Sequence, residues 1–204
     1  MQRKIVKNLI YAQISFFFCL IIDVVITTKG FSANRGLSFY GEHLDTVIPF
    51  AIGFFLCDFF ILRAAKLLPE LKPTFEVFIM PFRILALLLI LIVLTPDNLN
   101  GVFNVLHNTD SSSLFLFELI LGGWLVFRWH NTALTKVLLA SQFIVGIICG
   151  MSEFQFTRYL SESSLAYQLI FSILLVLTMS SVVNKSVPEE LETMSKLDEQ
   201  TEVK

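Results

Sequence analysis

The residues best placed to do chemistry are four ionisable side chains inside otherwise apolar runs: Asp23, Asp58, Arg83 and Glu118. Glu118 stands in the middle of "SLFLFELILGGWLVF". Inside a bilayer a carboxylate is costly unless a proton, a cation or water compensates it. An acid at such a position is therefore a candidate functional group by default.

The depths of these four residues predict two pairs, because a helix rises 1.5 Å per residue. Asp58 and Arg83 fall at matching depth in the inner half and carry opposite charges, so we expect a structural ion pair. The alternative is that Arg83 snorkels to the inner lipid head groups. Asp23 and Glu118 share a sign and a depth of about 6–9 Å below the outer surface. We expect them to line an outward-facing polar pocket, the alternatives being a protonated structural Glu118 and an interface-exposed Asp23.

Two polar connections on the same side add further pocket candidates: Ser38, Tyr40, His43, His107 and Asn108. Two histidines among carboxylates are able to bind a divalent metal or to exchange protons. However, no two potential ligands have the spacing of a shared helix face, as in H-x-x-x-H. The sequence therefore predicts no metal site, assigns no catalytic residue and leaves any cofactor unknown.

The elements that must position these residues are transmembrane helices. The chain of 204 residues is 55% hydrophobic and only 16% charged, against about 45–50% and about 25% in soluble domains. A membrane-spanning helix needs about 20 mostly apolar residues. Six runs qualify and predict an all-α six-helix bundle over residues 1–184, with spans near 8–28, 46–62, 77–95, 113–127, 134–151 and 165–183.

Charge distribution predicts the orientation of the bundle. With the N-terminus inside, roughly 12 Lys and Arg residues fall on the inner side and roughly 3 on the outer side. Both termini are then cytoplasmic, and residues 185–204 form an acidic, flexible cytoplasmic tail. The net charge of −2 gives no reason to expect a nucleic-acid partner.

Small residues predict where helices approach each other closely. Gly146 and Gly150 form a GxxxG pattern, and Gly122 and Gly123 give the fourth span a stretch without side chains, where another helix can approach its backbone. A second copy of the chain, bound through such a face in a homo-oligomer, is an alternative partner. Three widely spaced cysteines inside apolar runs indicate neither a disulfide framework nor a zinc site.

Three stretches carry a resemblance to a known group of proteins: "GLSFYGEHLDTVIPF" (36–50), "FNVLHNTDS" (103–111) and "AYQLIFSILL" (166–175). They resemble a family of uncharacterised multi-pass bacterial membrane proteins with six helices. The resemblance implies the same layout and a location in the bacterial plasma membrane. It transfers no activity and no catalytic residue, but it draws attention to Ser38, Tyr40, His107 and Asn108.

Three classes of function follow from these observations. In the first, the protein binds or moves a small solute, proton, ion or lipid through the outward-facing pocket. In the second, it is a structural or assembly partner within the bilayer and has no catalytic activity. In the third, it is a membrane-embedded hydrolase or transferase that uses His43, His107 and an acid, which requires these residues to converge in space.

Overall fold

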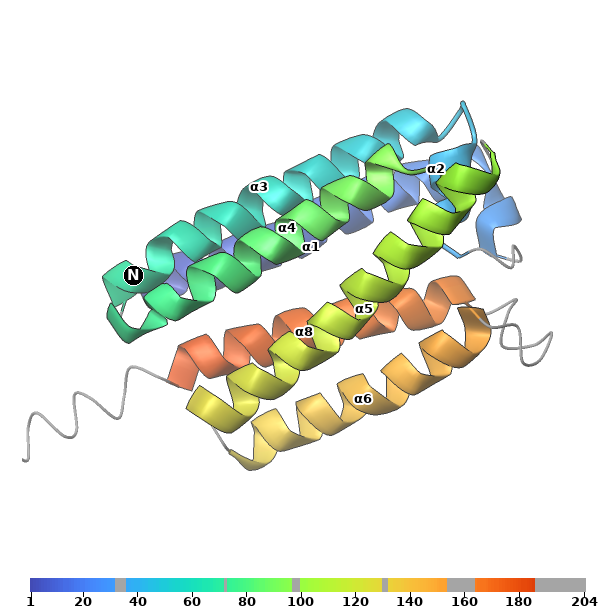
Figure 1. Cartoon of the computed structure of the whole chain (residues 1–204). Helices are drawn as coiled ribbons and strands as arrows, with labels where there is room; N and C mark the ends of the chain where they lie inside the picture. Colours follow the sequence, from blue (N-terminus) through green and yellow to red (C-terminus); the bar gives the residue numbers. More distant parts are fainter. Residues whose placement is uncertain (32–35, 72, 97–99, 130–131, 154–163, 186–204) are drawn as a thin grey trace, which may run out of the picture.

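The computed structural model of the chain is all-helical over the residues that it describes, 1–31, 36–71, 73–96, 100–129, 132–153 and 164–185 (Figure 1). In this part of the chain six helices are long and apolar enough to cross a membrane, which confirms the predicted number and fold class. They are α1 (Gln2–Ile26), α3 (Val47–Leu71), α5 (Gly101–Trp129), α6 (Ala133–Glu153), α8 (Ser164–Lys185) and the span Phe75–Leu94, which consists of α4 (Ile79–Leu94) and the end of the preceding η2. Shorter elements are η1 (Thr28–Phe31), α2 (Ser38–Glu42) and η2 (Pro73–Phe78). The expected acidic tail lies outside the described residues, apart from Lys185.

The fourth span differs from the prediction, since α5 begins at Gly101 instead of near residue 113. Asn100 is the physical reason. Its Oδ1 accepts hydrogen bonds from the backbone N–H groups of Val102 and Phe103, at 3.0 and 3.1 Å. An asparagine that accepts from the first free N–H groups is a favourable N-cap. The polar stretch 104–110 is consequently helical, and it carries His107 and Asp110 on a rigid element.

The end of α4 and the start of α6 also have local causes. Pro96 follows Thr95 directly after α4, and proline commonly follows a helix end because it cannot continue the helix. At the start of α6 the backbone N–H of Thr132 donates to Thr135 Oγ1 (3.0 Å), and the N–H of Thr135 donates to Thr132 Oγ1 (3.3 Å). These reciprocal bonds satisfy two donors that a helix start leaves free, as in a capping box.

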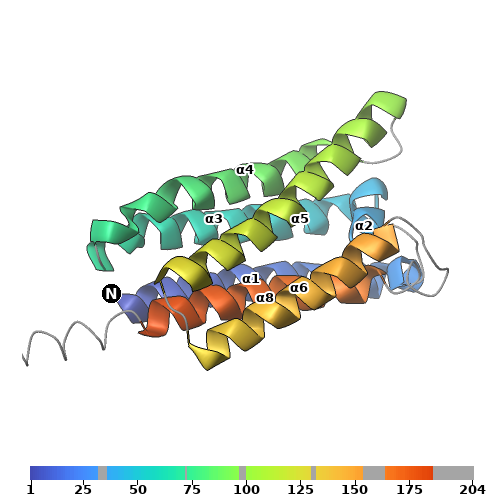
Figure 2. The same cartoon turned by 60° about the horizontal axis from the view of Figure 1, so that its bottom comes forward.

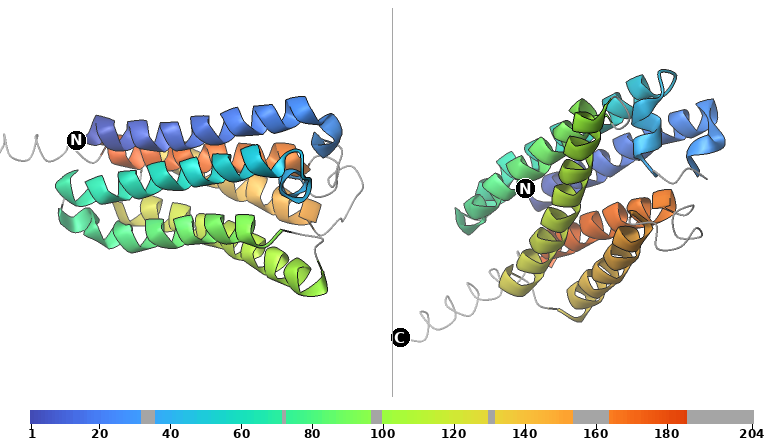
Figure 3. Two further views of the ribbon diagram at one scale, coloured as in Figure 1. Left: turned by 90° about the horizontal axis from the view of Figure 1, so that it is seen from above. Right: turned by 45° about the vertical axis from the view of Figure 1, so that its right-hand side comes forward.

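The long helices form two groups that α5 connects. Helices α1, α3 and α4 run side by side, and α6 lies beside α8 (Figures 1 and 3). Helix α5 crosses obliquely from α4 to the α6 and α8 group, while α1 also contacts α8. Edge-to-face contact between Phe16 and Phe54, at 5.2 Å, lies between α1 and α3. The rings of Phe115 and Phe171, 4.8 Å apart, pack α5 on α8.

Apolar side chains also cover the outside of the bundle. On α1 the large residues Ile14, Phe18, Ile21 and Val25 are 57–79% exposed and recur at helical spacing. A water-soluble protein rarely exposes a continuous apolar surface of this kind. Lipid tails are the medium that such a surface fits, and helices satisfy their backbone hydrogen bonds internally as lipid requires.

The bundle has two distinct ends. Helix α1 begins and α8 finishes at one end, which we call the terminal end (Figures 1 and 2). The short helix α2, the end of α4 and the start of α5 lie at the opposite end, which we call the α2 end. An even number of spanning helices has this consequence, since the chain returns to the side from which it started.

The glycines differ in how much space a side chain would find at each position. A Cβ added to Gly122 would lie 2.8 Å from Oε1 of the buried Gln142 on α6. A Cβ on Gly146 would lie 3.1–3.3 Å from the side chains of Phe115, Phe171 and Leu119. Both glycines thus serve packing within the chain. Gly123 and Gly150 have no side chain or neighbouring backbone within 4 Å of an added Cβ.

Gly122→Ala is expected to be less stable than Gly123→Ala, because its new methyl group must displace the side-chain amide of the buried Gln142, and overpacking typically costs about 1–3 kcal/mol. The adjacent Gly123→Ala is the matched control. It meets open space and removes a helix-interior glycine, which stabilises a helix by about 0.5–1 kcal/mol. Thermal unfolding of both variants in detergent measures the difference, and equal midpoints would contradict the described packing of α5 on α6.

Candidate functional site

The α2 end begins with a tight turn that α8 holds in place. Gly36 has φ +55°, a left-handed conformation that glycine adopts without strain. A Cβ there would also lie 2.5 Å from Gln168 Oε1. The next residue, Leu37, donates its backbone N–H to the same oxygen at 2.8 Å. A side chain from α8 therefore fixes the position at which α2 starts.

Ser38, the first residue of α2, is hydrogen-bonded to a histidine from α5. Ser38 Oγ lies 2.7 Å from His107 Nε2, and His107 Nδ1 lies 2.6 Å from the carbonyl oxygen of Thr95. His107 is 5% exposed, whereas Ser38 is half-buried. The sequence singles out both residues but gives no reason to pair them. The structure brings them together because α5 begins early enough to carry His107 alongside the end of α4.

Thr95 joins this group to an acid. Its hydroxyl donates to the carbonyl oxygen of Leu91 (2.7 Å) and lies 3.1 Å from Asp110 Oδ2. Asp110 stands three residues after His107 on α5, a spacing that puts both on one helix face. This corrects the expectation that no two potential ligands share a helix face, which treated these residues as part of a loop. Sequence reasoning does not select Thr95 or Asp110. The signal that would have found them is the Asn100 cap, which fixes the register of the helix.

Asp23 and Tyr40 form a second group at the same end. Both are fully buried, and in the described part of the chain neither Asp23 carboxylate oxygen nor the Tyr40 hydroxyl has a hydrogen-bond partner. Thr46 Oγ1 donates to the backbone carbonyl of Tyr40 at 2.7 Å and holds α2 to the start of α3. Burial, and after it the negative charge of Asp23, raise the pKa of the Tyr40 hydroxyl. Tyr40 therefore remains a hydrogen-bond donor facing a negative potential.

The expected ion pair between Asp58 and Arg83 is not formed. Asp58 is 3% exposed and neither of its carboxylate oxygens has a hydrogen-bond partner, whereas Arg83 is exposed. Matching depth is not sufficient for a pair, because each helix can still turn its residue to a different face. Arg83 turns toward the outside of the bundle, which is the geometry that the snorkelling alternative requires.

Glu118 and Asp23 have different neighbouring groups. Its side chain is half-buried, and its backbone carbonyl accepts a hydrogen bond of 3.3 Å from Gln142 Nε2. Cys57 on α3 lies within electrostatic range of both Asp58 and Glu118. Asp23 instead acts on Cys19 and Tyr40. Among the described residues, the structure gives no contact between Glu118 and Asp23, which the sequence predicts to line one pocket.

His43 and Asn108 do not join the Ser38 and His107 pair by any contact that the structure gives. His43 is exposed; its Nδ1 lies 2.7 Å from the carbonyl oxygen of Phe39, and the two rings are 4.0 Å apart. Asn108 is exposed on α5. Within the described ranges, no three His, Cys, Asp or Glu residues are grouped so that they could hold a metal ion.

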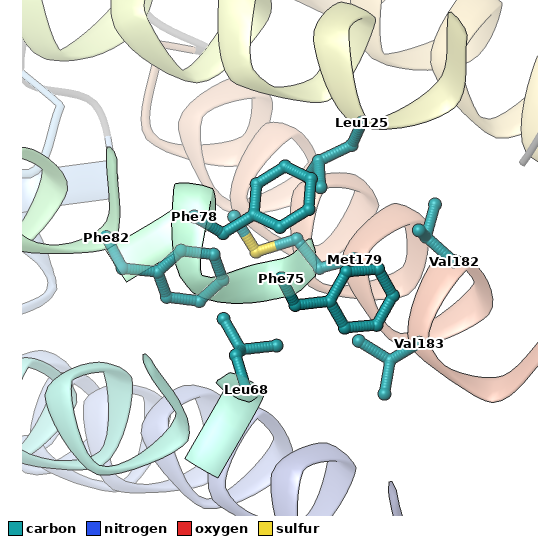
Figure 4. A pocket seen from close by; sticks show the side chains of 8 residues that line it. All are labelled: Leu68, Phe75, Phe78, Phe82, Leu125, Met179, Val182 and Val183. Atoms are coloured by element: carbon teal, nitrogen blue, oxygen red, sulfur yellow. The ribbon is translucent and has the colours of Figure 1, made fainter. Parts of the chain in front are cut away.

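A pocket of different character lies at the terminal end (Figure 4). It is a small recess with a cavity volume of only about 10 Å³, about the space of one water molecule. Apolar side chains from α3, η2, α4, α5 and α8 line it: Leu68, Phe75, Phe78, Phe82, Leu125, Met179, Val182 and Val183. The recess is apolar and at the end opposite to the one expected for a polar pocket, so it offers nothing to orient a polar ligand.

No family model, no curated protein and no solved structure matches this chain. The resemblance carried by the three short stretches consequently contributes no residue roles. The function has to be inferred from the buried carboxyls and from the hydrogen-bonded groups at the α2 end.

The Tyr40 hydroxyl is expected to titrate above the ordinary tyrosine pKa of 10.0, because burial and then the charge of Asp23 raise its pKa. Because the folded state holds the proton more tightly than the unfolded state, this group stabilises the fold below pH about 10 and loses that effect as the pH rises through its folded pKa. Absorbance at 295 nm measures the titration. Tyr40→Phe removes the late step, Asp23→Asn moves it to lower pH, and an unchanged curve for both variants would contradict the assignment.

Proposed function

We propose that this multi-pass membrane protein binds protons or small cations at buried carboxyls and moves them through the bundle, by themselves or together with a small solute. The observation that carries the proposal is that Asp23 and Asp58 are buried in membrane-spanning helices without a hydrogen-bond partner or a paired cation in the described part of the chain. A carboxylate without a counter-charge is unfavourable in an apolar interior. A bound proton or cation removes that penalty.

The three carboxyls are staggered along the bundle. Asp23 lies three residues before the last residue of α1, about 4.5 Å from that end of the helix. Asp110 lies level with Thr95, so Glu118, two turns further along α5, is about 12 Å deep. Asp58 lies twelve residues beyond Thr46 on α3, about 18 Å from the α2 end. A series of acids at increasing depth is the arrangement found in intramembrane proton relays.

The distribution of basic residues supports an orientation for this series. Near the terminal end the described helices carry Arg3, Lys4, Lys7, Arg63, Lys66, Arg128 and Lys136. Positive charges accumulate on the cytoplasmic side of membrane proteins. We therefore place the terminal end in the cytoplasm and the α2 end, with Asp23, on the outer side of a plasma membrane, as the resemblance to bacterial proteins also implies.

Purified protein in liposomes loaded with a pH-sensitive dye tests the transport activity. A potassium diffusion potential drives proton entry, and the wild type is expected to acidify the lumen faster than protein-free vesicles. Asp23→Asn and Asp58→Asn are expected to reduce this rate about tenfold or more, since each removes one protonatable relay group. Asp45→Asn is the matched control, because Asp45 is an exposed acid at the α2 end. Rates equal to protein-free vesicles for every form would favour the alternative, a structural or assembly partner.

Thiol labelling in intact cells tests the orientation. A cysteine introduced at the exposed Asp45 is expected to react with a membrane-impermeant maleimide before lysis. A cysteine introduced at the exposed Lys66, near the terminal end, is expected to react only after the membrane is opened. The native cysteines are replaced by alanine in both proteins. The opposite pattern would place Asp23 on the cytoplasmic side and reverse the direction of the proposed series.

A further inference from the structure

We propose that Ser38 and His107 form a nucleophile and general-base pair at the α2 end, a site for transfer of an acyl group from an ester. The first observation is the short contact between Ser38 Oγ and His107 Nε2, 2.7 Å. The second is that a third group orients the histidine, as catalytic pairs require. This site uses none of the carboxyls Asp23, Asp58 and Glu118 and is independent of the proposed ion movement.

The hydrogen-bond partners determine the histidine tautomer. A carbonyl oxygen only accepts, so the 2.6 Å contact with Thr95 O requires the proton of the neutral ring on Nδ1. Nε2 then carries the lone pair, and the Ser38 hydroxyl donates to it. The Thr95 carbonyl is available for this role because Thr95 caps α4, where the last carbonyls lack partners in the helix. The base is thus presented to the serine in the state that can take its proton.

Three distant parts of the chain hold Ser38 in this geometry. Gln168 of α8 fixes the residue before it, Thr46 at the start of α3 binds the carbonyl of Tyr40 two residues later, and His107 of α5 binds the serine itself. Catalysis requires such positioning, since a small displacement of a reacting group lowers the rate strongly. The histidine is 5% exposed, whereas the half-buried serine reaches the edge of the protein.

The surroundings point to an amphiphilic ester as the substrate. On the first two turns of α5, next to His107, Val102, Val105 and Leu106 are 68%, 65% and 45% exposed. Leu44, which follows α2, is 90% exposed. Apolar side chains at the end of a membrane bundle favour contact with an acyl chain at the lipid surface. The reacting carbonyl is then delivered at the depth of Ser38.

The reaction needs no group beyond the ester and an acceptor. Ser38 Oγ bonds to the carbonyl carbon as His107 Nε2 takes the hydroxyl proton. The bond from that carbon to the leaving alkoxide breaks, and His107 returns the proton to it, which releases an alcohol and leaves an acylated serine. Water or an acceptor alcohol then gives its proton to Nε2 and attacks the carbonyl carbon. Ser38 leaves as the alkoxide and regains the proton, which releases the acid or the new ester.

A fluorophosphonate carrying a fluorescent tag tests the nucleophile in the full chain in detergent, because such probes react with activated serines. We expect covalent labelling of the wild type on the peptide that contains Ser38, no labelling of Ser38→Ala, and at least about a hundredfold slower labelling of His107→Gln. The control is Ser112→Ala, an exposed serine on α5, which should label like the wild type. Absence of label on the folded wild type, or label elsewhere, would overturn the proposal.

A second variant separates a catalytic pair from a hydrogen bond that only holds α2 in place. In Ser38→Cys the base should generate thiolate below the ordinary thiol pKa of about 8.5. The rate of iodoacetamide reaction at position 38, followed by mass spectrometry against pH, should then have a midpoint at least about one unit lower than in the double variant that adds His107→Gln. Equal midpoints near about 8.5 would show that His107 does not act as a base, even if both proteins are folded.

Discussion

The cost of leaving polar groups unpaired in an apolar interior determines how this chain is organised. Lipid supplies no hydrogen bonds, so six helices satisfy their own backbones and present apolar side chains outward. Polar side chains of α8, α5 and the start of α3 hydrogen-bond to α2 or to the residue before it at the α2 end, and other such bonds join α1 to α8 and α6 to α5. Against this background the few buried polar groups that stay unpaired, Asp23 and Asp58 among them, stand out as exceptions that structure alone does not account for.

Sequence reasoning recovers the helical class and the number of spans because apolar run length is a strong signal in membrane proteins. It misplaces the start of α5, since hydropathy ends near residue 113 while the Asn100 cap extends the helix to Gly101. That single difference changes the candidate site. Residues that seem to belong to a loop become one face of a helix, and His107 is brought to Ser38.

Pairings between helices are harder to predict from sequence than depths along them. Counting residues predicts that Asp58 and Arg83 lie at the same depth, but it says nothing about rotation around each helix axis. The structure turns Asp58 inward and Arg83 outward. The rotation of α1 and α5 about their axes is likewise not given by the sequence, so equal depth does not predict that Glu118 and Asp23 share one pocket. Tyr40 is visible in the sequence as a candidate, whereas its burial beside Asp23 depends on how α2 folds back between α1 and α3.

The oblique course of α5 makes it a lever between the two helix groups (Figure 3). It touches α4 on one side and α6 and α8 on the other, and it carries His107 near one end and Glu118 further along. A rigid rod that pivots where it crosses its neighbours moves its two ends in opposite directions. A change in its tilt would therefore displace the hydrogen-bonded group at the α2 end and the Arg128 end together, which would couple the two ends of the bundle mechanically through one helix.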